Sequence, residues 1–202
     1  TIQPDGLYTA TISGYAASTV VQLYVRAVDG LGAVATFPAR GANGGALYKV
    51  NDGQANVALE HNFRIVTSPA NAALLHADTN LMSNDNLPCT LIYDGRLAFY
   101  DVGLRLKGSM YARRVQSRVG FHLAFQPDEL FRGVHPAMGM DRRPGDASPP
   151  GEEIVVRHVA LAAGGVPAMH LDAVRTLSPR GTENGPALIT PSYEDEFIET
   201  AF

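Results

Sequence analysis

Several stretches of the chain alternate apolar and polar residues with a period of two, which is the pattern of strands that bury one face. In residues 119–125 this alternation puts Phe121, Leu123 and Phe125 on one side, and in residues 19–29 it puts Val21, Leu23, Val25 and Ala27 on one side. The pattern predicts strands at residues 7–12, 19–29, 33–37, 62–67, 89–93, 96–106, 119–125 and 166–177. So many short strands separated by turns indicate a β-rich globular protein.

Turn signals indicate which of these strands are neighbours. Asp94-Gly95 lies between the runs at 89–93 and 96–106, and this dipeptide is a strong signal for a two-residue hairpin turn. We therefore expect these two runs to pair. We also expect 96–106 and 119–125 to be antiparallel neighbours in the same sheet.

Helix-start signals occur at two places. Ser68-Pro69 supplies an N-cap followed by proline at the first helical position. A longer helix is expected at 151–163, where Glu152 and Glu153 lie in the first turn and favour the positive end of the helix dipole. We expect this second helix to cover the sheet.

Together these elements predict an α+β fold: a twisted antiparallel sheet with two or three covering helices, preceded by an N-terminal β-hairpin segment. Residues 1–50 have the hairpin order of the closing edge of an immunoglobulin- or fibronectin-type sandwich. Because such a sandwich has about seven strands, we expect further strands upstream. Residues 51–202 make up the α+β domain, which we expect to be cut short at its C-terminus.

Composition narrows the range of partners. The 202 residues carry a formal net charge of −4, with 46% hydrophobic and 18% charged residues, so the chain has no global attraction for nucleic acid or for an anionic membrane. No stretch approaches the ~20 apolar residues that span a bilayer. The single cysteine, Cys89, cannot form an intramolecular disulfide, and its apolar neighbours predict a buried, unreactive thiol.

Most motifs of known chemistry do not occur in the sequence. The six histidines show no zinc-binding spacing, and there is no nucleophile elbow, no Walker A loop and no dinucleotide-binding glycine pattern. His122 lies between two apolar strand residues, so its side chain should point away from the apolar face, as a surface or hydrogen-bonded histidine.

One segment has the residue types of an anion site. Lys107-Gly108-Ser109 follows a predicted strand, and Arg113 and Arg118 lie in the basic connection to the next one. Glycine and serine beside exposed backbone N–H groups, with cations nearby, suit a nucleotide phosphate. On pattern alone, the alternative of a β-hairpin with a basic, solvent-exposed tip is favoured.

A family resemblance changes that weighting. Five short motifs follow one another at residues 105–109, 120–125, 130–135, 152–156 and 164–168: Arg-Leu-Lys-Gly-Ser, Gly-Phe-His-Leu-Ala-Phe, Leu-Phe-Arg-Gly-Val-His, Glu-Glu-Ile-Val-Val and Gly-Gly-Val-Pro-Ala. This succession resembles the CotH family, the spore-coat protein H-like atypical protein kinases, over roughly residues 62–202. Each motif is short, so the specificity comes from their order.

The resemblance implies a role for each matching position, with ATP and Mg²⁺ as cofactors. The 107–109 turn would correspond to the loop that covers the phosphates. Arg118 would stand where the family has its ATP-contacting lysine, and Glu153 or Glu152 would be the helix carboxylate that pairs with it. Arginine keeps the charge of that lysine but not its compact geometry. The resemblance therefore predicts that Lys107, Arg118 and Glu153 lie close together in the fold.

The leading hypothesis is the N-terminal portion of a CotH-like atypical kinase domain from a bacterial exported protein, located outside the cell or at its surface, with a nucleotide or protein substrate. The family's metal-binding and catalytic aspartates belong downstream, and Asp141, Asp172 and Asp195 are candidates by composition only. We therefore expect weak ATP binding and no phosphoryl transfer. One alternative is a non-catalytic surface module that binds carbohydrate or protein. Another is a hydrolase with a scattered site.

Overall fold

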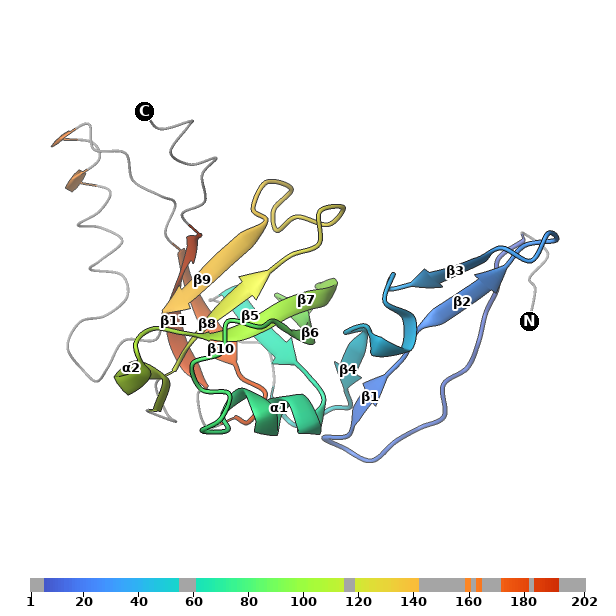
Figure 1. The fold of residues 1–202 in the computed structure, drawn as a ribbon, viewed down its shortest axis with the longest axis horizontal. Coiled ribbons are helices and arrows are strands. Elements are labelled where there is room, and N and C mark those ends of the chain that lie inside the picture. Colours follow the sequence, from blue (N-terminus) through green and yellow to red (C-terminus); the bar gives the residue numbers. More distant parts are fainter. Residues whose placement is uncertain are drawn as a thin grey trace.

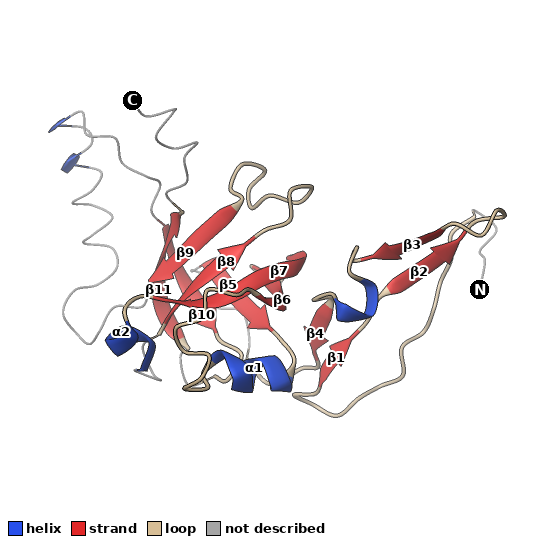
Figure 2. Ribbon diagram, in the orientation of Figure 1, coloured by secondary structure: helices blue, strands red, loops and turns tan. Residues whose placement is uncertain are grey.

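The protein consists of an N-terminal arm and a closed β-barrel (Figure 1). The computed structural model describes residues 6–54, 61–114, 119–141, 159–160, 163–164, 172–181 and 184–192. The N-terminal arm comprises residues 6–54 and projects away from the barrel, as Figure 2 also shows. The barrel is built from the strands that follow the arm.

Seven strands form the barrel. They are β5 (His61–Val66), β6 (Leu87–Tyr93), β7 (Leu97–Lys107), β8 (Gly120–Ala124), β9 (Ala137–Asp141), β10 (Asp172–Leu177) and β11 (Gly185–Pro191). Their order around the barrel is β10-β11-β9-β8-β7-β6-β5. Neighbours are antiparallel except at the closing pair, where β5 and β10 run parallel.

The expected α+β fold, with an open sheet under two or three covering helices, is therefore wrong. The barrel closes on itself, so its strands bury their apolar side chains against one another across the interior and need no helical layer on one face. Two short α-helices lie within the described residues, α1 (Pro69–Leu75) and α2 (Met110–Arg114). The helix expected at 151–163 falls outside the described residues apart from positions 159–160 and 163, which are helical.

The barrel interior is filled by large apolar side chains. Phe121 and Leu123 are fully buried and Phe125 is nearly so, which confirms that this run presents one apolar face. The loop between β8 and β9 inserts Phe131, whose ring lies within 5.3–5.7 Å, centroid to centroid, of four other aromatic rings: Phe63, Tyr93, Phe99 and Phe125. The cluster lies at the end of the barrel where β8 ends and β9 begins, and edge-to-face and offset contacts are the favourable geometries for aromatic pairs.

The segment around α1 covers the other end. The Ser68 Oγ accepts a hydrogen bond from the Asn71 N–H at 3.1 Å, so the predicted N-cap before Pro69 is confirmed. Leu75, on this helix, and Leu81, just beyond it, belong to the buried core. In the described part of the chain, no helix is long and apolar enough to cross a membrane.

The predicted hairpin and strand pairing are confirmed. Asp94 and Gly95 have positive φ angles of 53° and 64°, and the Arg96 N–H donates to the Tyr93 carbonyl at 3.0 Å, as in a type I′ turn. Strands β7 and β8 are antiparallel neighbours, with Leu104 opposite Leu123. The turn residues Asp94 and Gly95 therefore specify the hairpin of β6 and β7.

The N-terminal arm contains two separate two-stranded sheets. Strand β1 (Val20–Gln22) pairs with β4 (Leu47–Lys49), and β2 (Val25–Val28) pairs with β3 (Val34–Phe37). A 3₁₀ turn, Gly41–Asn43, precedes β4. The single strand expected at 19–29 is thus split in two. Residues 7–12, expected as a strand, have no regular structure apart from one bridge residue, Tyr8.

The arm is joined to the barrel at a tight seam on β6. Thr90, fully buried at the bulge between Cys89 and Leu91, donates its hydroxyl to the Gly45 carbonyl and accepts from the Leu47 N–H at 2.7 Å. A side chain at Gly45 would have its Cβ 2.6 Å from the Cys89 carbonyl oxygen. Only glycine lets the two backbones approach this closely.

Candidate functional site

The predicted anion-binding segment lies on the outside of the barrel. On β7, Leu104 and Leu106 point into the core, so Arg105 and Lys107 point outward. The pairing places Arg105 beside His122 on β8, and His122 beside Gly139 on β9. In the next row, Lys107 pairs with Gly120. The term basic face is used below for Arg105, Lys107, His122 and Asp141 with the two glycines, Gly120 and Gly139, between them.

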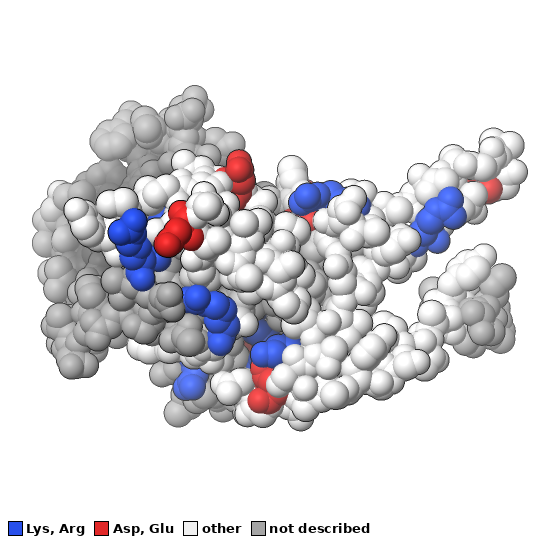
Figure 3. Space-filling view, turned by 60° about the horizontal axis from the view of Figure 1, so that its bottom comes forward, with Lys and Arg blue, Asp and Glu red and all other residues white. Residues whose placement is uncertain are grey.

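Figure 3 shows that basic side chains over the barrel are interspersed with a few acidic ones. On the basic face, Asp141 is the carboxylate in contact: its Oδ2 lies 2.5 Å from the Lys107 Nζ. Arg105 donates from one terminal nitrogen to the Asn84 side-chain oxygen at 3.0 Å, which leaves its charge unpaired by any carboxylate among the described residues. The face therefore carries two cations and one anion.

Burial and the neighbouring cations both act on the imidazole of His122. Burial, and then the charges of Arg105 and Lys107, lower the pKa of His122 from 6.5 to about 4. The imidazole is consequently neutral at physiological pH, so one ring nitrogen can donate a hydrogen bond and the other can accept one. Its outward orientation agrees with the expectation from the sequence, and the Ser192 hydroxyl lies 3.5 Å from its Nδ1.

Two glycines shape the floor of the basic face. A Cβ at Gly139 would come within 3.1 Å of the Lys107 Cε and Nζ, which shows that the lysine side chain lies across the bare backbone of β9. A Cβ at Gly120 would come within 2.7 Å of the Met140 carbonyl oxygen. Side chains at either position would displace the lysine or push the strands apart.

The other cofactor-binding candidates lie just beyond Lys107. Gly108 has a φ of 103°, which turns the chain out of β7, and the Ser109 Oγ accepts from the Ala112 N–H at 3.4 Å. Arg113 is buried and donates to three main-chain carbonyls at 2.8–3.1 Å: those of Gly108, Leu81 and Ser83. Through these bonds Arg113 connects α2 to the loop that follows α1, so its side chain has a structural role.

The proposed catalytic pair, Arg118 and Glu153, lies outside the described residues, as do Glu152 and Asp195. Their convergence on Lys107 therefore stays a prediction. The other two candidate aspartates are described: Asp141 is on the basic face, and Asp172 pairs with Arg132 at 2.6 Å.

Sequence reasoning found Lys107 but did not connect it with His122 or Asp141. The strand that carries Asp141, β9, was not predicted, because Ala-Met-Gly-Met has no β-branched residue. The available signal was the alternation of Arg105 and Lys107 with two leucines, which places both cations on one outer face.

The CotH resemblance implies Mg²⁺ as a cofactor, which would need oxygen ligands from the protein. Within the described ranges, no three His, Cys, Asp or Glu side chains come together in a group that could hold a metal ion. Asp141 is a lone carboxylate already paired with Lys107. The described residues do not supply a magnesium site, so no chemical step through the metal can be derived from them.

Comparison with known proteins adds no family: no protein-family model matches the chain, and no curated protein is significantly similar to it.

Proposed function

We propose that the basic face binds a phosphate-bearing ligand, with a nucleotide such as ATP as the first candidate, within a CotH-like atypical kinase domain. One observation carries the proposal. Lys107 lies over the bare backbone of Gly139, with Arg105 and a partly buried neutral imidazole in the adjacent row. Partial burial strengthens the attraction of such cations for an anion relative to bulk water.

The contacts suggest how a phosphate would be held. Lys107 can turn one of its three N–H donors toward a phosphate oxygen while another stays with Asp141. Arg105 presents a planar fork that matches two phosphate oxygens, and His122 can donate a further hydrogen bond. These groups bind and orient; they do not by themselves transfer a phosphoryl group, so the proposal stops at binding.

Calorimetric titration with ATP, with and without Mg²⁺, tests the proposal. We expect weak binding that falls at least about tenfold in Lys107→Gln, because a hydrogen bond to a charged group contributes about 1.5–3 kcal/mol and about 1.4 kcal/mol corresponds to a factor of ten. Arg26→Gln, at an exposed cation on β2, is the matched control and should bind like the wild type. The Arg118→Ala variant tests whether Arg118, which the CotH resemblance matches to an ATP-contacting lysine, belongs to the same site.

Two results would contradict the proposal. Equal affinities of Lys107→Gln and the wild type would place the ligand elsewhere. Equal affinities for adenosine and ATP would show that the phosphates are not recognised.

A second candidate function, a non-catalytic module that binds carbohydrate or protein, is favoured by the arm. Tyr8, Tyr15 and Tyr24 are 78%, 51% and 47% exposed, and tyrosine combines an apolar ring with a polar tip that suits such contacts. Retention of the wild type on insoluble polysaccharide, lost in a Tyr8→Ala/Tyr24→Ala variant, would support this candidate. No retention by the wild type would count against carbohydrate binding.

A further inference from the structure

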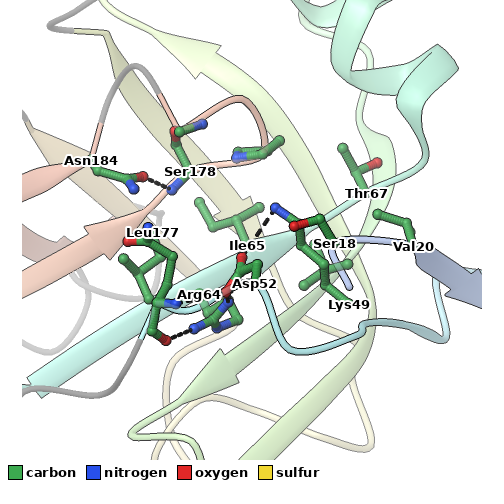
Figure 4. Close-up of a pocket in the computed structure, with 14 residues that line it drawn as sticks. Ser18, Val20, Lys49, Asp52, Arg64, Ile65, Thr67, Leu177, Ser178 and Asn184 are labelled. Atoms are coloured by element: carbon green, nitrogen blue, oxygen red, sulfur yellow. Dashed lines mark hydrogen bonds and ion pairs between the residues drawn. The ribbon is translucent and has the colours of Figure 1, made fainter. Parts of the chain in front are cut away.

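A cavity of about 230 Å³ lies at the seam between the N-terminal arm and the barrel, away from the basic face. Figure 4 shows its walls, which come from three separate parts of the chain. The arm contributes Lys49 and Asp52, β5 contributes Arg64, and the loop after β10 contributes Ser178. The name seam pocket is used for this cavity.

The charged groups of the seam pocket form one cluster. The Asp52 carboxylate, 9% exposed, lies 3.1 Å from the Lys49 Nζ and accepts from the Arg64 guanidinium at 3.1 Å on both oxygens. Arg64 also donates to the Gln54 carbonyl. Among the described residues that line the pocket, two cations therefore face one carboxylate, which leaves one positive charge without a counter-ion.

Lys49 is the cation most available to a ligand. The guanidinium of Arg64 is held from both terminal nitrogens by Asp52 and Gln54, whereas Lys49 has a single described partner, Asp52, for its three N–H donors. Its side chain is 28% exposed. An ammonium group in this setting can take an oxyanion without giving up its ion pair.

The rest of the lining is suited to a polar molecule of sugar size. Ser18, Thr67, Ser178 and Asn184 are among the lining residues, beside the buried Val66. The Thr67 hydroxyl donates to the Pro88 carbonyl and the Asn184 side-chain oxygen accepts from the Ser178 N–H, so the amide nitrogen of Asn184 and the hydroxyl of Ser18 are the groups best placed to meet a ligand. The volume is below that of pockets for drug-sized ligands. Polar residues around one cation that has no counter-ion of its own among the described residues favour a hydroxylated ligand with a single anionic group.

We propose that the seam pocket binds a small hydroxylated oxyanion, a sugar acid or sugar phosphate, with Lys49 as the contact to its charge. The ligand would touch both the arm and the barrel, so it would hold the two parts together. This site is independent of the nucleotide proposed for the basic face.

Three probes of equal carbon skeleton separate the chemistry: glucose 6-phosphate, gluconate and glucose. In thermal-shift and calorimetric measurements on the full chain, we expect at least one of the two anions to bind and to raise the melting temperature, while glucose does neither. Lys49→Gln should weaken anion binding at least about tenfold, and Lys49→Arg, which keeps the charge, should restore most of it. Lys107→Gln should bind gluconate, which carries no phosphate, like the wild type.

A measurement on the wild-type protein tests the proposal without depending on how well the variants fold. Amide hydrogen exchange of residues 177–181 and 49–52 should slow on addition of the anion and not of glucose. The proposal is overturned if neither anion binds at millimolar concentration, if glucose binds equally well, or if Lys49→Gln binds like the wild type. Loss of binding in Lys107→Gln but not in Lys49→Gln would assign the anion to the basic face instead.

Discussion

The N-terminal arm and the barrel have the same alternation of apolar and polar residues, yet the barrel buries its apolar side chains and the arm leaves many of them exposed. Phe121 and Leu123 on β8 have no exposed surface, whereas Val25 on β2 and Val34 on β3 are 58% and 53% exposed. Alternation specifies that a strand has two faces. It does not specify whether a second layer exists to cover one of them.

The difference follows from the number of strands that each part brings together. Seven strands close into a barrel and surround a common interior. The pair β2–β3 has no third strand among the described residues, and an isolated two-stranded hairpin is at best marginally stable in water. We therefore expect the arm to contribute little to stability except at its seam with the barrel.

The largest effect is expected for a core truncation in the barrel. Phe121→Ala should lower the free energy of unfolding by about 3–5 kcal/mol, because it removes a fully buried ring and leaves a cavity. Phe37→Ala is the matched change in the arm; its ring is 55% exposed and meets Tyr100 edge-on at 5.6 Å, so a loss below about 1 kcal/mol is expected. Urea denaturation measures both, and similar losses would show that the arm has a core of its own.

The seam should be sensitive to one added methyl group. Gly45→Ala should cost about 1–3 kcal/mol, since the new Cβ would lie 2.6–3.0 Å from backbone atoms of Cys89 that cannot move without disturbing β6. Gly14→Ala, where nothing lies within 4 Å, is the control and should be nearly neutral. If Gly45→Ala unfolds at the wild-type urea concentration, the arm is not docked as described.

A smaller effect is expected from the ion pairs of Asp52. Burial alone would raise the pKa of this carboxyl, but hydrogen bonds from Gln54, Lys49 and Arg64 outweigh it and lower the pKa from 3.8 to about 2. Because the folded pKa is below the unfolded one, the stabilisation is complete above about pH 4 and is lost as the pH falls through about 2.

Asp52→Asn should therefore cost about 1–2 kcal/mol at neutral pH, a value reduced by solvent screening. The gap to the wild type should narrow in urea titrations carried out at successively lower pH. Asp78→Asn, which has no ion pair among the described residues, should show no such trend. A gap independent of pH would exclude the ionised carboxylate as its source.

The smallest effect concerns reactivity and not stability. Cys89 is fully buried, as predicted, and burial, with the nearby charge of Asp101, raises the pKa of its thiol. A thiol reagent should label the native barrel only as fast as it opens, whereas a cysteine introduced in the arm by Val28→Cys should react at once. Labelling of Cys89 at the rate of the arm cysteine would contradict the described burial.

Sequence patterns predicted the locally encoded parts of the fold. The turn at Asp94-Gly95, the cap at Ser68 and the pairing of β7 with β8 each depend on neighbours in the chain. Barrel closure does not: β11 carries Pro186 and Pro191, which lower its strand signal, and its partner β9 lacks β-branched residues. A sheet without these two strands would be open, and its apolar face would need helices to cover it.

The candidate site was predictable to the same extent. Lys107 was found because charge and glycine stand side by side in the sequence. Arg113 has the same charge, but its bonds to three carbonyls depend on a loop about thirty residues earlier. The seam pocket was missed because Lys49, Arg64 and Ser178 come together only when the barrel closes.

The parallel pairing of β5 with β10 also has a consequence for synthesis of the protein. More than a hundred residues separate His61 from its partner Val174. Closure therefore has a high contact order, which slows folding. On the ribosome, β5 emerges long before β10 and has to keep an unpaired edge until β10 has been synthesised. An exposed strand edge can pair with other chains, so the nascent chain is most at risk of aggregation during this interval, when a chaperone would have the greatest effect on yield.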